Sequence, residues 1–301
     1  MLTVFFQMLA LILMIGTGYV ITRKGMMDEH TNGQISGMVV NVFIPLLFFS
    51  GALNAGSFVS MDSMVLVFLI AMGMYVFFLL SGMLLTPFFE KRPEQMRIFQ
   101  MMCVFSNTGF IGVPVVNSVL GPEYLIFVTE FLLAYNLFFY TYGIMMMDGS
   151  FSVSSLKAMV NPGMVCSVAA VAIVLGDIHL PDFIETAITC LGNTASPLAL
   201  ILVGFSLACA DLGKILREGR LYLFSLLKLL VLPLLMLPVL RMVTDDRAVT
   251  VVCMAMFGMP VGSMILMLGN ERGMDGTTCG AAIILSTVLC VFTIPVLLAV
   301  I

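Results

Sequence analysis

The residues SNTGFIGVPVVNSVLG, 106–121, interrupt an otherwise apolar segment. The amide of Asn107 and the sequence Gly112-Val113-Pro114 do not suit an unbroken membrane helix. Proline removes a helical hydrogen bond and clashes with the preceding turn, while glycine lowers the cost of leaving helical geometry. In hydrocarbon, the freed backbone groups must be buried in protein or face a wet cavity. The stretch therefore predicts a broken membrane helix.

The composition around this stretch is that of a membrane protein. Of the 301 residues, 61% are hydrophobic and 10% are charged, whereas about 25% are charged in soluble domains. Apolar segments long enough to cross a bilayer occur in ten places, numbered here as spans 1 to 10. We expect an all-α integral membrane protein with ten transmembrane helices. The spans cover residues 2–22, 34–53, 61–86, 98–119, 123–147, 161–177, 183–209, 221–241, 248–269 and 276–300.

The basic residues predict the orientation of these spans. Ten of them lie in the loops after the odd-numbered spans, and the opposite loops hold two, Arg241 and Arg247. The positive-inside rule places the ten in the cytoplasm, so both termini are expected outside the plasma (inner) membrane. No basic patch suggests a nucleic-acid partner. The ten are Arg23, Lys24, Lys91, Arg92, Arg97, Lys157, Lys214, Arg217, Arg220 and Arg272.

Matched motifs divide the chain into two halves. Spans 2 and 7 share an Asn followed four residues later by Pro-Leu, and spans 4 and 9 each carry a Gly-x-Pro. Because each half has five spans, the second half enters the membrane from the opposite side. We predict inverted repeats over residues 1–150 and 155–301. The motifs are Asn41/Pro45/Leu46, Asn193/Pro197/Leu198, Gly112-Val113-Pro114 and Gly258-Met259-Pro260.

Paired broken helices in corresponding spans are a sequence indication of a transporter's binding site. A half-helix that starts after a break presents unpaired amides and a positive dipole end, which favour an anionic group. Asn107 and Thr108 near the first break, and Ser263 near the second, can hydrogen-bond an oxygen-rich ligand. A serine or threonine can equally bond back to its own helix. Asn136 in span 5 is a further ligand candidate.

Two ionisable residues lie inside predicted spans, Glu130 in span 5 and Lys228 in span 8. Intramembrane charges are costly and are functional candidates by default. The alternative for Lys228 is that its long stem carries the ammonium to the membrane surface. Glu130 and Lys228 are candidates for proton or charge coupling. The histidines His30 and His179 fall in loops and the seven cysteines are scattered, so neither a metal site nor a cofactor is expected.

These motifs resemble the auxin efflux carrier family of membrane transporters, and the resemblance covers essentially the whole chain. The family includes plant auxin exporters and bacterial members described as malate or malonate permeases. PLLFFSGAL in span 2 resembles the family's Pro-Leu-Leu element, NTGFIGVP in span 4 its Asn-Thr…Gly-x-Pro signature, and GMPVGSM in span 9 the paired break. NLFFYTYG in span 5 is similar to a segment in which plant members have Gln at the position of Asn136.

The resemblance implies a fold shared with bile-acid transporters and sodium–proton antiporters, so the fold alone decides neither substrate nor coupling. It implies that spans 4 and 9 cross at Pro114 and Pro260 within a transport domain of spans 3–5 and 8–10. Spans 1, 2, 6 and 7 would form a scaffold and a homodimer surface. Asn107 would contact the substrate carboxylate, with Asn136 nearby. The brief loop after span 5 favours a compact prokaryotic-type carrier.

The expected function is secondary or potential-driven transport of a small organic anion, a mono- or dicarboxylate or an auxin-like weak acid, by elevator-type alternating access. A sodium-coupled organic-anion symporter of the bile-acid type is the alternative. An intramembrane enzyme would need a nucleophile–base pair or paired acids at one depth, yet the embedded ionisable residues are essentially Glu130 and Lys228. A receptor of this architecture would be unusual, and ligand binding without flux would support it.

Overall fold

The computed structural model describes residues 2–54, 60–148, 160, 162–176, 178, 180–210, 218–271, 274 and 276–301. Several residues named above lie outside this described part: His179, Lys157, Lys214, Arg217 and Arg272. The predicted boundary between the repeats, residues 150–155, also lies outside it.

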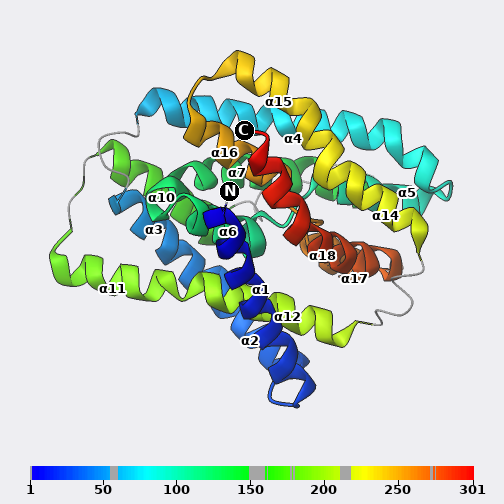
Figure 1. The fold of residues 1–301 in the computed structure, drawn as a ribbon, viewed down its shortest axis with the longest axis horizontal. Helices are drawn as coiled ribbons and strands as arrows, with labels where there is room; N and C mark the ends of the chain where they lie inside the picture. The colour runs from blue at the N-terminus through cyan, green and yellow to red at the C-terminus, as the bar shows by residue number, and fades with distance from the viewer. Residues whose placement is uncertain are drawn as a thin grey trace. The chain divides into compact units, whose positions relative to one another are not determined.

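Within the described residues the secondary structure is helical, apart from an isolated β-bridge between Ser106 and Val261. Figure 1 shows the helices in chain order. The first half contains α1 (Leu2–Arg23), α2 (Glu29–Met38), η1 (Val39–Phe43), α3 (Ile44–Asn54), α4 (Met61–Phe89), α5 (Pro93–Val104), η3 (Thr108–Gly112), α6 (Val113–Val119), η4 (Pro122–Tyr124), α7 (Leu125–Phe138), η5 (Phe139–Gly143) and α8 (Ile144–Asp148). The second half contains α10 (Pro162–Leu175), α11 (Asp182–Asn193), α12 (Ala195–Cys209), α14 (Gly219–Leu226), η6 (Leu227–Val231), α15 (Leu232–Val243), α16 (Arg247–Phe257), α17 (Met264–Glu271) and α18 (Thr277–Ala299).

Six of these helical stretches are long and apolar enough to cross a membrane. The multi-pass membrane character predicted from the composition is therefore confirmed. Shorter apolar helices fall at the remaining predicted spans 1, 4, 6 and 9, so the crossing of all ten stays a prediction. The six are Glu29–Asn54, Met61–Phe89, Pro122–Met147, Asp182–Cys209, Gly219–Val243 and Thr277–Ala299.

Three prolines follow short π-helical segments within the spans. Pro45, Pro114 and Pro233 are each the second residue of an α-helix that directly continues η1, η3 or η6. Proline supplies no N–H and its ring clashes with the carbonyl four residues earlier. A wider π turn before the ring relieves this clash, and such turns are frequent at functional sites. The prolines thus explain where three spans depart from α-helical geometry.

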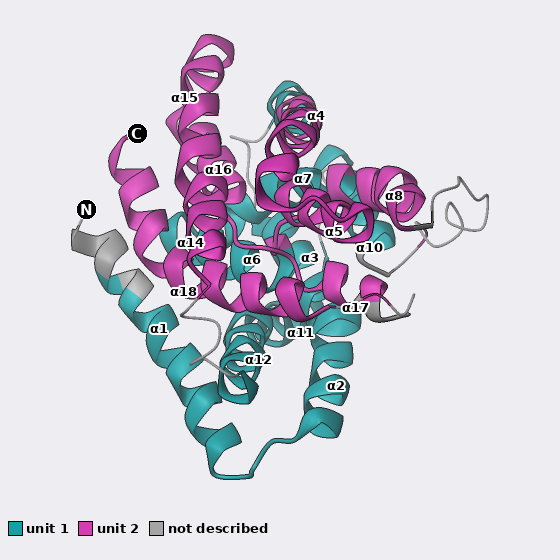
Figure 2. Ribbon diagram, turned by 90° about the vertical axis from the view of Figure 1, so that its right-hand side faces the viewer, with its two compact units in different colours: residues 1–68, 109–133, 161–210 teal, residues 69–108, 134–160, 211–301 magenta. Residues whose placement is uncertain are grey.

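The chain divides into two compact units (Figure 2). Unit 1 comprises residues 1–68, 109–133 and 161–210. In it α1 packs along α12 at glycines: a Cβ at Gly18 would collide with the carbonyl of Ile201, and one at Gly204 with the carbonyl of Ile15. Small residues of this kind let membrane helices approach closely. Helix α3 packs against α10 and α11, where Ser50 Oγ and Thr189 Oγ1 lie 3.1 Å apart.

Unit 2 comprises residues 69–108, 134–160 and 211–301. Its core holds an aromatic cluster around Phe105, whose ring lies 5.5 Å from Tyr135 and 5.1 Å from Phe139, both edge-on. Tyr75 from α4 packs 6.3 Å from Phe105 and stacks 5.3 Å from Phe138. Edge-to-face and offset pairs at these distances stabilise aromatic contacts. The cluster holds α4 and α7 against the residue that follows α5.

Candidate functional site

Two interrupted spans pair through their backbones in unit 2. Helix α5 ends at Val104 and α16 ends at Phe257, and the segments that follow run antiparallel. The N–H of Asn107 donates to the carbonyl of Pro260 at 2.7 Å, and the N–H of Gly262 donates to the carbonyl of Phe105 at 3.0 Å. These two bonds satisfy backbone groups that the helix breaks would otherwise leave unpaired in an apolar setting. We call residues 105–107 and 260–262 the paired breaks.

The two hydrogen bonds of the paired breaks form one antiparallel contact. Ser106 and Val261 face each other at its centre. Asn107 lies opposite Pro260 and Phe105 lies opposite Gly262, so each break donates one hydrogen bond and accepts the other. A polar residue follows each break, Thr108 after the first and Ser263 after the second.

The structure shows which part of span 4 meets Pro260. The carbonyl of Pro260 accepts the N–H of Asn107, which lies between α5 and η3. Pro114 lies seven residues further along the chain, as the second residue of α6. The crossing of Pro114 and Pro260 that the resemblance implies stays a prediction.

Lys228 reaches the first of the paired breaks from η6. Its Nζ donates to the carbonyl of Cys103 at 2.8 Å and to Ser106 Oγ at 3.0 Å. The side chain is 1% exposed, and Nζ lies 5.3 Å from the centre of the Phe78 ring. The stem therefore does not run to the membrane surface. A cation is favoured at the carboxyl end of a helix such as α5, where carbonyls lack helical partners.

Ser286 supports the second of the paired breaks and was missed in the sequence. Its Oγ accepts the N–H of Val261 at 3.1 Å and donates to the carbonyl of Ile283 at 3.1 Å. Ser286 is fully buried in α18. In the sequence, a serine that bonds to a distant segment cannot be distinguished from a serine that bonds only to its own helix.

The other predicted ligand residues of unit 2 differ in burial. Thr108 is 2% exposed and Asn107 is 9% exposed, whereas Ser263 is exposed. Asn136 is half-buried on α7, directly after Tyr135, whose ring packs on Phe105. Unit 2 thus brings Asn107, Thr108, Pro260, Ser263 and Lys228 to the paired breaks, and holds the helix of Asn136 against Phe105.

The remaining predicted site residues lie in unit 1. Gly112 and Pro114 are buried at the start of α6. Glu130 is 5% exposed on α7, and it has no ion-pair partner among the described residues. No group of three or more metal-ligating side chains occurs in the part of the chain that the structure describes.

Long apolar helices with paired breaks and a buried lysine at one of them define an integral membrane protein built around interrupted helices, the architecture typical of transporters. The comparison with protein families agrees. A family model described as "Membrane transport protein" matches residues 3–152 and again residues 149–298. The chain belongs to this family, the auxin efflux carriers, as its motifs had suggested. No curated protein matches the chain.

Proposed function

We propose that this membrane transporter carries a small organic anion, a mono- or dicarboxylate, and that the anion binds at the paired breaks. The observation that carries the proposal is the buried ammonium of Lys228, bonded to Ser106 directly beside Asn107. A fixed positive charge in a site of low polarity favours a ligand of opposite charge. The side chains of Asn107, Thr108 and Asn136 would then bond the carboxylate oxygens.

The same contacts favour an anion carrier without a coupling cation over a sodium symporter. A sodium site at a helix break needs oxygen ligands such as backbone carbonyls. The carbonyl of Cys103 and the hydroxyl of Ser106 already accept hydrogen bonds from Lys228. A sodium ion there would have to compete with the ammonium and would suffer its repulsion. Efflux of an anion from an inside-negative cell is favoured by about 2.3 kcal/mol per charge per 100 mV and requires no second ion.

The division of the chain is consistent with an elevator mechanism. Unit 1 contains predicted spans 1, 2, 6 and 7, the proposed scaffold and homodimer surface. Unit 2 contains spans 8 to 10, most of span 3, and the halves of spans 4 and 5 that carry Asn107 and Asn136. The other halves of spans 4 and 5, with Pro114 and Glu130, belong to unit 1. We propose that the paired breaks move as part of unit 2, with both termini on the outer side of the plasma membrane. The two hydrogen bonds between the breaks would keep the site intact during such a movement.

The test begins with a thermal-shift screen of purified protein against mono- and dicarboxylates, followed by flux into proteoliposomes. A stabilising carboxylate should be transported, and its flux should respond to an imposed membrane potential but not to a sodium gradient. Flux that requires sodium would favour the symporter. Binding without any flux would favour a receptor and overturn the proposal.

Glu130 provides a separate test for proton coupling. A buried carboxyl without an ion-pair partner is a candidate for a proton that moves with the substrate. We expect Glu130→Gln to flatten the pH dependence of transport between pH 5 and 8, on the order of a few-fold in rate. Glu123→Gln, at the start of the same span, is the matched control and should keep the wild-type profile. A Glu130→Gln profile identical to wild type would remove this residue from the mechanism.

A further inference from the structure

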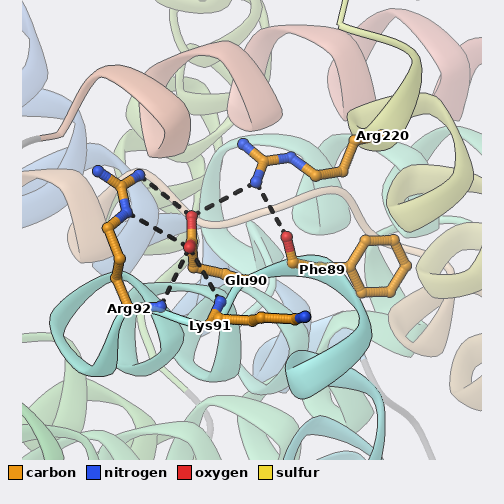
Figure 3. Close-up of polar contacts among 5 residues, drawn as sticks. All are labelled: Phe89, Glu90, Lys91, Arg92 and Arg220. Atoms are coloured by element: carbon orange, nitrogen blue, oxygen red, sulfur yellow. Dashed lines mark hydrogen bonds and ion pairs between the residues drawn. The ribbon is translucent and has the colours of Figure 1, made fainter.

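A cluster of charged residues joins the end of α4 to the start of α14, within unit 2 (Figure 3). Two guanidinium groups share the carboxylate of Glu90. Arg92 Nη2 lies 3.2 Å from Glu90 Oε2, and Arg220 Nη1 lies 3.4 Å from the same oxygen. Arg220 Nη1 also donates to the carbonyl of Phe89 at 2.9 Å. We call Glu90, Lys91, Arg92 and Arg220 the α4 cluster.

The α4 cluster keeps an excess of positive charge at neutral pH. The pKa of Glu90 is lowered to about 2, first by the hydrogen bond from the Arg92 side chain and then by the backbone N–H groups of Arg92 and Lys91. The carboxylate is therefore ionised throughout the physiological range, and the cluster carries three cations and one anion. Lys91 is exposed, and its ammonium has no ion-pair partner among the described residues.

Aromatic packing holds the cluster in place before any ligand arrives. The Arg220 guanidinium lies 5.4 Å from the centre of the Phe99 ring. Phe224, one turn further along α14, meets Phe89 at 5.5 Å and Phe99 at 5.4 Å, both edge-on. In the described contacts Arg220 uses Nη1, which leaves its Nε and Nη2 donors for another acceptor. A fixed guanidinium with two donors on one edge suits the oxygens of a phosphate.

Exposed apolar side chains lie on α4 and α14 next to the cluster. Leu80, Leu84 and Phe88 recur every four residues on α4 and are 59%, 71% and 81% exposed. Residues four apart lie on one face of a helix. Leu223 on α14, one turn after Gly219, is 56% exposed. In a membrane protein such faces contact acyl chains, and the charges at their end lie where lipid headgroups begin.

We propose that the α4 cluster binds the headgroup of an anionic phospholipid, its phosphate on Lys91 and Arg220 and its acyl chains along α4 and α14. The proposal rests on the proposed orientation, which puts these residues at the cytoplasmic leaflet, where anionic lipid attracts basic side chains. A lipid held here would contact unit 2, the unit that carries the paired breaks. Lipid composition would therefore influence the proposed moving part directly.

The test measures thermal unfolding of the full-length protein in detergent with added dioleoyl phosphatidylglycerol or dioleoyl phosphatidylcholine. Phosphatidylglycerol should raise the melting temperature of the wild type more than phosphatidylcholine does. Lys91→Gln should weaken the apparent affinity for phosphatidylglycerol roughly fivefold, the value of one basic residue near an anionic surface. Because the Lys91 side chain has no described ion pair, this variant should fold normally. Arg220→Gln should weaken it further.

Two controls make the outcome decisive. Arg241→Gln, which removes a basic residue on the opposite predicted side, should leave the phosphatidylglycerol effect unchanged. An equal effect in Lys91→Gln and wild type would overturn the proposal, as would a full effect from inorganic phosphate alone, which would identify a phosphate site instead. Carboxylate binding measured in phosphatidylcholine should be the same in Lys91→Gln and wild type, so a failure of the proposed transport function would be seen separately.

Discussion

Lys228→Met is expected to weaken anion binding and transport severely while leaving a protein that still folds. Methionine keeps most of the stem's volume but removes the donor, so the carbonyl of Cys103 and the hydroxyl of Ser106 lose their bonds to Nζ. An unsatisfied buried polar group costs about 1–3 kcal/mol, which should appear as a lower melting temperature. The loss of the positive charge beside Asn107 should reduce carboxylate affinity by more than tenfold, measured by thermal shift and by flux in proteoliposomes.

Ser286→Ala is the control that distinguishes the effect of losing the positive charge from the effect of losing a hydrogen bond that supports the breaks. It removes the acceptor of the Val261 N–H and so weakens the second of the paired breaks without changing any charge. We expect a comparable loss of stability but a much smaller loss of carboxylate affinity. If Lys228→Met bound carboxylates as tightly as wild type, the ammonium would have only a structural role, and the assignment of the anion site would fail.

Asn107→Ala should weaken carboxylate binding by roughly 10- to 150-fold, the range of one hydrogen bond to a charged group. Alanine retains the backbone N–H that donates to Pro260, so the pairing of the two breaks should survive. The variant should therefore express and melt nearly as wild type does. Ligand-dependent thermal shift and equilibrium binding measure the effect.

Asn117→Ala is the matched control for this prediction. Asn117 belongs to the same stretch of sequence but lies on α6 in unit 1. Its replacement should leave the affinity of the paired breaks unchanged. Equal affinities in Asn107→Ala and wild type would contradict a binding site on span 4.

The sequence predicted the helical class, the position of the apolar segments and the interruption of span 4, because each depends on local composition and on proline and glycine. It did not predict which residues pair across the breaks. The Gly-x-Pro motifs mark where helices start or stop, whereas the partner of Pro260 is fixed by tertiary packing of α5 against α17 and α18. The amide side chain of Asn107 makes it a ligand candidate, but no feature of the sequence indicates that its backbone N–H donates to the carbonyl of Pro260.

Lys228 and Ser286 show the same limit of sequence-based prediction. The sequence identified Lys228 as unusual but did not decide whether its ammonium lies inside the membrane or at the membrane surface. Its position in a π segment just before Pro233, and the carbonyl of Cys103 that accepts from it, depend on two distant parts of the chain. No feature of the sequence identified Ser286, because a serine in an apolar helix can bond either to its own helix or to another segment.

The lysine at the paired breaks has an electrical consequence for the proposed cycle. If unit 2 carries Lys228 through the membrane field, a carrier loaded with a monoanion is electrically neutral, and the empty carrier moves with one positive charge. Voltage would then act on the return of the empty carrier, at about 2.3 kcal/mol per 100 mV, and not on the loaded step. A dianion would make both steps voltage-dependent. Charge movements recorded from substrate-free proteoliposomes, present in the wild type and lost in Lys228→Met, would distinguish the empty carrier as the voltage-sensing form.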